Sequence, residues 1–225
     1  MTLESRKNLM HRLSPLLALL FATPALADTL DCAVIKSTTH PFEITFDWTM
    51  TQKGKDPLTV QMHRQVIRKA DETIVYEYFL REKFTRRTLN PAGFRMQVRS
   101  AGEAATAARI SNYSIDVTKD YFALGKPFDF KEIVKGEDGA VVADIDTAVS
   151  FDGTVNVDVG GCSYALTKII EVSHGSVRGK AGRNRIETWY SRDLKTSLYT
   201  RNEDGDGPVM EMRARDISTS FKPVE

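Results

Sequence analysis

The sequence contains few of the residues from which metal sites and local catalytic motifs are built. It has two cysteines and four histidines among 225 residues. Beyond the N-terminal segment, His40, His63 and His174 each lack a histidine or cysteine two or four positions away, so no local zinc pattern is present. The G-x-S-x-G, phosphate-loop and H-E-x-x-H motifs are also missing. We therefore predict no metal, no cofactor and no catalytic residue from local motifs.

A charge excess of one sign and a second long apolar run are also missing. The formal net charge is +1, and basic and acidic residues nearly balance from Asp28 onward. Because nucleic-acid binding requires a basic surface, this balance argues against a nucleic-acid partner. The apolar run from Leu13 to Phe21 is shorter than the roughly 20 residues that a membrane-spanning helix needs. We predict no membrane span.

The N-terminal segment has the three regions of a secretory signal peptide. They are the basic residues Arg6, Lys7 and Arg12, the apolar run, and the small-x-small sequence Ala25-Leu26-Ala27. We expect a cleaved signal peptide over residues 1–27, a mature N-terminus at Asp28 and a periplasmic or secreted location. Cys32 lies too far from this cleavage site to be a lipid-modified N-terminal cysteine.

The two cysteines, Cys32 and Cys162, allow only one pairing within the chain. In an oxidising compartment this predicts one disulfide that ties the N-terminal segment to the C-terminal third. A disulfide that closes a loop from Cys32 to Cys162 stabilises the folded protein by roughly 5 kcal/mol in the chain-entropy model. A redox-active pair is the weaker interpretation, because the C-x-x-C spacing is absent.

Most of the remaining sequence alternates apolar and polar residues, as half-buried strands do. In "FEITFDWTM" one face carries Phe42, Ile44, Phe46, Trp48 and Met50. Similar short segments follow at 58–69, 73–80, 83–89, 94–100, 109–117, 121–125, 128–134, 140–146, 154–159, 163–172, 184–190, 196–201 and 209–218. The alanine-rich segment 101–110 breaks the rhythm and is predicted as one helical turn or a surface loop.

These strands predict a single all-β domain over residues 28–225. Short connections favour antiparallel pairing, because parallel strands need long crossovers. A sheet of about a dozen strands must curl, split or close. We therefore expect one curved antiparallel sheet that forms a barrel or a half-barrel, with a two-sheet β-sandwich as the alternative.

Two charged segments admit both a functional and a simpler interpretation. In "NEDGDG", residues 202–207, Asn202, Asp204, Asp206 and Gly207 match the start of a calcium loop, but Arg213 occupies the position of the final carboxylate. An acidic hairpin turn explains the same residues. The basic cluster Arg81, Lys83, Arg86 and Arg87 is either a solvated strand face or a surface that attracts an anionic ligand or lipid head group.

The segment "IETWYSRDLKTSLYT", residues 186–200, gathers aromatic, hydroxyl and charged residues in a manner typical of active sites. No histidine lies close enough in sequence to activate Ser191. Serine and aspartate side chains bond to nearby backbone groups in turns, so we interpret residues 191–195 as the turn of a β-hairpin. The alternation then places Trp189 and Tyr190 on opposite faces of the sheet.

Aromatic residues supply the best candidates for ligand binding. A curved sheet can enclose an apolar ligand where its interior is not filled by side chains, although the same residues can simply fill a core. The candidate ligand-binding residues are Phe42, Phe46, Trp48, Tyr76, Tyr78, Phe94, Met96, Trp189 and Tyr190.

The pair of segments "GGCSYALTKIIEV" and "IETWYSRDLKTSLYT", within Gly160 to Arg201, resembles a pattern in uncharacterised exported bacterial proteins of the domain-of-unknown-function type. In these proteins a Cys-x-Tyr strand precedes an aromatic pair, a serine and an Asp-Leu turn. Their general shape is similar to the lipoprotein-carrier half-barrels of the Gram-negative periplasm. The resemblance implies an antiparallel sheet curved around an apolar groove, with no catalytic residues.

Three functions fit these observations. The first is a soluble periplasmic barrel-like binding or envelope-maintenance protein that holds a lipid or another apolar or amphipathic ligand. The second is a structural or partner-binding module with a filled core that binds an envelope protein. The third, an enzyme acting on envelope material, would need a cleft of converging carboxylates or histidines that no motif indicates.

Overall fold

The computed structural model describes residues 31–37, 40–101, 106–205 and 207–224. The expected signal peptide, residues 1–27, lies outside the described residues and stays a prediction. Asp206 of the calcium-like segment lies outside them as well. None of the described helices is both long enough and apolar enough to cross a membrane.

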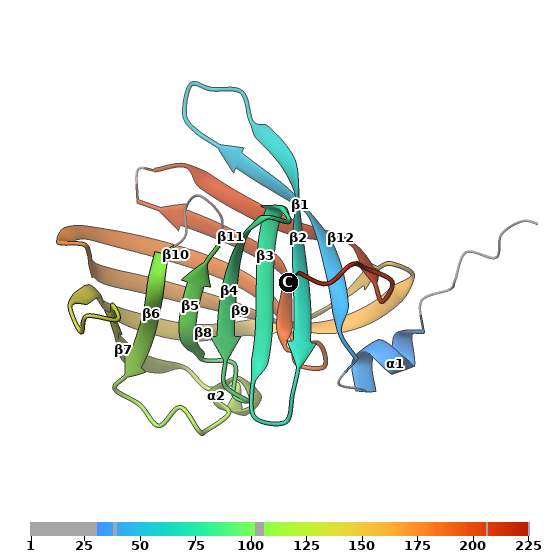
Figure 1. The fold of residues 1–225 in the computed structure, drawn as a ribbon, viewed down its shortest axis with the longest axis horizontal. Coiled ribbons are helices and arrows are strands. Elements are labelled where there is room, and N and C mark those ends of the chain that lie inside the picture. Colours follow the sequence, from blue (N-terminus) through green and yellow to red (C-terminus); the bar gives the residue numbers. More distant parts are fainter. Residues whose placement is uncertain (1–30, 38–39, 102–105, 206, 225) are drawn as a thin grey trace, which may run out of the picture.

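The described residues form a closed antiparallel barrel (Figure 1). Each strand pairs with the next along the chain, and β1 also pairs with β12, which closes the sheet. The elements are α1 (Cys32–Ser37), β1 (Phe42–Thr51), β2 (Leu58–Arg68), β3 (Thr73–Leu80), β4 (Lys83–Leu89), β5 (Arg95–Ser100), β6 (Thr106–Tyr113), α2 (Tyr121–Leu124), β7 (Phe128–Lys135), β8 (Val141–Val159), β9 (Cys162–Val177), β10 (Lys180–Ser191), β11 (Thr196–Asp204) and β12 (Val209–Ser218). The prediction of an all-β antiparallel fold is confirmed, and the sheet is a barrel rather than a half-barrel or a sandwich.

Three local predictions were wrong. Residues 140–146 and 154–159 were expected to form separate strands, but both lie in the single strand β8. Residues 121–125 were expected to form a strand, but Tyr121–Leu124 is the short helix α2 in the connection between β6 and β7. The alanine-rich segment 101–110 was expected to be a helical turn or a loop, yet its residues from Thr106 onward belong to β6. Pairing of β6 with both β5 and β7 outweighs the helix propensity of alanine in this segment.

The up-and-down order gives the barrel two different ends. The turns at 52–57, 81–82, 136–140 and 178–179, together with Gly205 and residues 207–208, all lie at one end, which we call the distal end. The opposite end carries α1 and α2, and we call it the helical end. Because β2 pairs with β3 only from His63 onward, residues 47–61 of the β1–β2 hairpin project beyond β3 at the distal end (Figure 1). We call this projection the flap.

The packed core lies toward the helical end. Its fully buried side chains come from α1, β1, β2 and the far end of the β8–β9 hairpin, and they include Ile35, Phe42, Ile44, Phe46, Val66 and Leu166. Cys32 of α1 is bonded to Cys162 of β9, with a Cα to Cα distance of 5.6 Å, so the predicted disulfide is confirmed. The β8–β9 turn that precedes Cys162 consists of Gly160 and Gly161, whose φ angles of 58° and 80° favour glycine.

Candidate functional site

A cavity of about 820 Å³ is lined by residues of β4 to β12. Val177, Lys180 and Asp204 line it at the distal turns, so it reaches that end of the barrel. The polar side chains of the lining include Arg87, Arg95, Glu132, Glu171, Asn184 and Asn202. The apolar side chains include Leu89, Phe94, Phe130, Ile145, Ile186 and Met210. This mixed lining suits an amphipathic molecule.

An ion pair crosses the cavity wall from β5 to β7. Nη2 of Arg95 donates to both carboxylate oxygens of Glu132, at 2.6 and 2.8 Å. The hydroxyl of Tyr113 donates to the backbone carbonyl of Arg95 at 2.8 Å and to Glu132 at 3.2 Å. Burial and the nearby Glu132 carboxylate raise the pKa of Tyr113, because both disfavour the phenolate. Tyr113 therefore stays neutral and acts as a donor.

Glu171 of β9 is a carboxyl group of the cavity without a close partner. Among the described residues, no donor or cation lies within hydrogen-bond or ion-pair distance of it. Burial raises the pKa of Glu171; Arg95 partly opposes this shift, and the charge of Glu132 adds to it. The group is thus biased toward its neutral form, in which it can donate a hydrogen bond to a ligand.

Three further polar atoms of cavity residues are buried without a hydrogen-bond partner among the described residues. They are Nε of Arg95 and the Oδ1 atoms of Asn184 and Asn202. A buried polar atom without a partner costs about 1 to 3 kcal/mol. Asn184 and Asn202 lie on the neighbouring strands β10 and β11, where Asn202 is opposite Ile186 and Asn184 is opposite Asp204. A ligand that accepts a hydrogen bond from Nε of Arg95, or donates one to Oδ1 of Asn184 or Asn202, would recover part of that cost.

A second set of charges separates the cavity from the packed core. Glu77 of β3 accepts hydrogen bonds from Nε and Nη2 of Arg64 at 2.9 and 2.6 Å, and its other oxygen lies 2.7 Å from Nη2 of Arg87. Burial alone would raise the pKa of Glu77, but Arg87 and Arg64 outweigh it and lower that pKa. The Arg64 guanidinium also stacks 4.7 Å above the ring of Phe46. Arg87 lines the cavity, so this chain of charges reaches from the core to the cavity wall.

A smaller cavity of about 580 Å³ lies at the helical end, against α2. Phe122, Tyr190, Arg192, Asp193 and Lys195 are among its lining residues. The rings of Tyr190 and Phe122 stack with centroids 5.7 Å apart. Burial raises the pKa of Tyr190, so its hydroxyl stays protonated.

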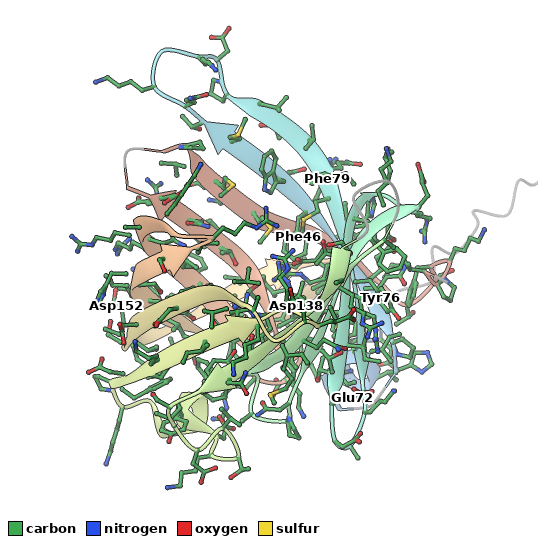
Figure 2. The ribbon with its side chains drawn as sticks, turned by 60° about the vertical axis from the view of Figure 1, so that its left-hand side comes forward. Phe46, Glu72, Tyr76, Phe79, Asp138 and Asp152 are labelled. Carbon is green, nitrogen blue, oxygen red and sulfur yellow. A yellow bond between two sulfur atoms is a disulfide. The ribbon has the colours of Figure 1, made fainter. Side chains whose placement is uncertain are left out.

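Of the predicted ligand-binding residues, Phe94 and Tyr190 are among those that line the two cavities described above, and the other candidates are not. Phe94 lines the larger cavity and Tyr190 the smaller one. Phe42 and Phe46 are fully buried in the packed core. Trp48 lies at the base of the flap, edge-on to Phe79 with ring centroids 5.5 Å apart (Figure 2).

The remaining aromatic candidates contact other parts of the barrel. Tyr78 donates to the Glu43 carboxylate beside Gln65, and burial together with this bond raises the pKa of Tyr78 to about 12. Tyr76 packs edge-on against Phe84 with centroids 5.4 Å apart, away from Phe46 (Figure 2). The register shift between Thr88 and Leu89 leaves Met96 of β5 without a partner on β4. Ligand binding by these residues remains a prediction.

The segment 186–200 forms the predicted hairpin. β10 and β11 flank the turn 192–195, and Oγ of Ser191 accepts a hydrogen bond from the backbone of Leu194 at 3.2 Å. Trp189 packs against the core with its indole nitrogen 3.3 Å from Glu187, whereas Tyr190 lines the smaller cavity. Ser191 itself ends β10 and pairs with Thr196, so the turn begins one residue later than predicted, while the expected hydrogen bond from the turn backbone to the Ser191 side chain is present.

Sequence reasoning did not single out Arg95, Glu132, Glu171, Asn184 or Asn202 as cavity residues; Asn202 figured only in the calcium-like pattern. One sequence pattern could have identified two of them: a charged residue that the two-residue alternation places on the same strand face as apolar residues. Glu132 follows Phe128 and Phe130 on alternate positions of β7, and Glu171 follows Ile169 on β9. A carboxylate on a buried face needs a partner or a shifted pKa, so this pattern indicates a polar interior.

The described residues contain no arrangement of side chains that would suit a metal ion. No group of three or more histidine, cysteine, aspartate or glutamate residues there is arranged to hold a metal ion. In the calcium-like segment, Asn202 and Asp204 belong to strand β11 and line the larger cavity, so they do not wrap around an ion in a loop.

No protein-family model and no curated protein matches the chain. Among solved structures it is similar to the hypothetical lipoprotein YmcC of Escherichia coli K12, with 9% identity, a TM-score of 0.38, and 76% of this chain and 86% of that chain covered. It is also similar to a proposed exported protein with a YmcC-like fold from Bacteroides fragilis NCTC 9343, with 11% identity, a TM-score of 0.42, and coverage of 81% and 97%. A proposed lipoprotein of Parabacteroides distasonis ATCC 8503 has 10% identity, a TM-score of 0.41, and coverage of 84% and 100%.

Proposed function

We propose that the protein is an exported binding protein of the cell envelope that holds a small amphipathic molecule in the larger barrel cavity. The predicted signal peptide and the disulfide of Cys32 and Cys162 support an oxidising compartment. The observation that carries the proposal is the cavity of about 820 Å³ whose wall combines apolar side chains with polar groups that lack protein partners.

The distribution of side chains suggests how the ligand lies. Arg95, Glu171 and Asn184 would contact its polar group, because their hydrogen-bonding capacity is not used up by the protein. Phe94 and Ile186 would contact its apolar part. A neutral Glu171 can donate to the ligand, and an ionised Glu171 can pair with a cationic group, so both kinds of polar group are compatible with the site.

Native mass spectrometry of the protein isolated from the periplasm tests the proposal. We expect a population with a bound small molecule that is absent after denaturation and refolding. The variant Gly182→Trp should abolish it, because Gly182 lines the cavity and an added Cβ would meet nothing within 4 Å. Ser150→Trp, at an exposed position of β8, is the matched control. Equal ligand content in both variants would contradict the proposal.

A partner-binding module remains the second candidate, and one observation favours it. The core beside α1 is filled, with Phe42, Phe46 and Tyr164 buried in it. Co-purification of an envelope protein with both the wild type and Gly182→Trp, without any small molecule in the wild type, would support this function instead.

A further inference from the structure

Exposed apolar side chains concentrate at the distal end of the barrel. Of the seven large hydrophobic residues that are exposed in the described part of the chain, only Ile110 lies in the middle of a strand. The other six lie in the first three or last two residues of strands next to the distal turns, and they are Leu58, Val60, Phe79, Leu80, Val141 and Val177. A monomeric soluble protein rarely exposes large apolar patches, so this concentration at one end indicates a surface that contacts another molecule or a membrane.

The six residues form two patches on opposite sides of the barrel. The flap patch consists of Leu58, Val60, Phe79 and Leu80 on β2 and β3, and Figure 2 shows Phe79 at the base of the flap. The β9 patch consists of Val141 and Val177 on β8 and β9, which begin and end beside the same turn. The strand order separates β2 and β3 from β8 and β9 by several strands in either direction. Two separate contacts of this kind fit a broad surface better than a small pocket.

Each patch has basic side chains beside it. Lys53 and Lys55 lie in the turn of the flap, with Asp56 as the acidic residue of that turn. Arg178 and Lys180 flank the β9 patch. All four cations are exposed. Apolar side chains next to exposed cations match the interface of an anionic lipid layer, where head groups attract the cations and the acyl region accepts the apolar groups.

The distal end also carries acidic side chains, among them Glu82 in the β3–β4 turn and Asp204 at the end of β11. Glu137 and Asp138 occupy the β7–β8 turn, and Glu137 lies 3.5 Å from Arg99, so its charge is partly balanced. Within the described part of the chain, the four cations Lys53, Lys55, Arg178 and Lys180 form no ion pair with a carboxylate. We propose that the distal end docks on an anionic lipid surface through the flap patch and the β9 patch.

This docking places the mouth of the larger cavity against the lipid. Val177 and Lys180 belong to the docking surface and also line the cavity. A molecule that leaves the bilayer could then enter the barrel without crossing bulk water. The inference does not rest on ligand binding, because the patches are defined by their exposure and charge alone.

Vesicle flotation with the purified protein tests this inference. We expect binding to vesicles of phosphatidylcholine mixed with phosphatidylglycerol, weak binding to phosphatidylcholine alone, and release at high salt. A lysine near an anionic surface strengthens binding about fivefold, so Lys53→Gln with Lys55→Gln should weaken it about 25-fold. The matched control is Lys119→Gln with Lys126→Gln, which changes two exposed lysines at the helical end.

The apolar contribution is tested separately by Leu58→Ser with Leu80→Ser. These residues are 50% and 56% exposed, so the substitution should leave the fold intact and weaken vesicle binding roughly tenfold. Ile110→Ser, at a residue 45% exposed but away from the patches, is the control and should have no effect. Failure to bind either kind of vesicle, as expected if a protein covers the patches, overturns the inference. An equal loss of vesicle binding in the patch variants and in their controls overturns it as well. Neither result bears on small-molecule binding in the cavity.

Discussion

Arg95 of β5 and Glu132 of β7 share two short contacts across the cavity wall, from one guanidinium nitrogen to both carboxylate oxygens, at 2.6 and 2.8 Å. Between their strands lies β6, whose Tyr113 bonds to both residues. The three side chains therefore fix the relative position of three consecutive strands and the shape of the cavity there.

Replacing Glu132 should destabilise the protein because it leaves Arg95 without its counter-charge. The Arg95 side chain is 38% exposed and that of Glu132 is 9% exposed, so we expect Glu132→Gln to cost about 2 kcal/mol, between the values for surface and buried pairs. Urea unfolding measures this loss. Glu137→Gln removes the partner of Arg99 in an exposed pair and should cost at most about 1 kcal/mol. Equal losses in the two variants would show that the buried pair has no special role.

Glu171 should make stability fall as pH rises. Burial holds the pKa of Glu171 above its unfolded value, so between the two pKa values the folded protein binds more protons than the unfolded chain. Its contribution is thus fully present below the unfolded pKa and is lost as pH rises through the folded pKa. Glu171→Gln should raise the melting temperature at neutral pH and leave it nearly unchanged in acid. The exposed substitution Glu82→Gln should shift neither value, and parallel pH profiles for wild type and Glu171→Gln would argue against a buried neutral acid.

Gly175 should tolerate no side chain because β8 passes too close to it. A Cβ at Gly175 would lie 2.1 Å from the carbonyl oxygen of Asp144 and 2.8 Å from Cα of Ile145. We expect Gly175→Ala to lose about 3 kcal/mol or to force the two strands apart. Gly182 faces it across the β9–β10 ladder, and a Cβ there would meet nothing within 4 Å. Gly182→Ala should therefore be neutral or slightly stabilising, which thermal unfolding of the two variants will check.

Removal of the disulfide should weaken the helical end most. Cys32 and Cys162 are 130 residues apart, so the chain-entropy model gives a loss of about 5 kcal/mol for the variant with both cysteines replaced by serine. The bond also holds α1 over the core, where Ile35 is fully buried. Hydrogen exchange should speed up in α1 and in the β8–β9 turn before it does so in β6 and β7. Uniform acceleration over the whole barrel would contradict this local role.

Several features of the fold could be predicted from the sequence because neighbouring residues decide them. The alternation in β1 places Phe42, Ile44 and Phe46 on one face, and all three are buried. Two cysteines allow a single pairing within the chain. The turn after Ser191 follows from local hydrogen bonding. The cavity was harder to predict, since Arg95 and Glu132 meet only through the register of β5, β6 and β7.

The sequence by itself determined most of the strands, their antiparallel order and the disulfide, because period, connection length and cysteine count are local properties. Only the tertiary structure decided that β1 pairs with β12, because that contact joins segments far apart in the chain. Closure of the barrel in turn decided that polar side chains of β5, β7, β9, β10 and β11 line one cavity, and that the flap and the β9 patch share one end. Long-range strand pairing sets these juxtapositions, and no pattern within a single segment encodes them.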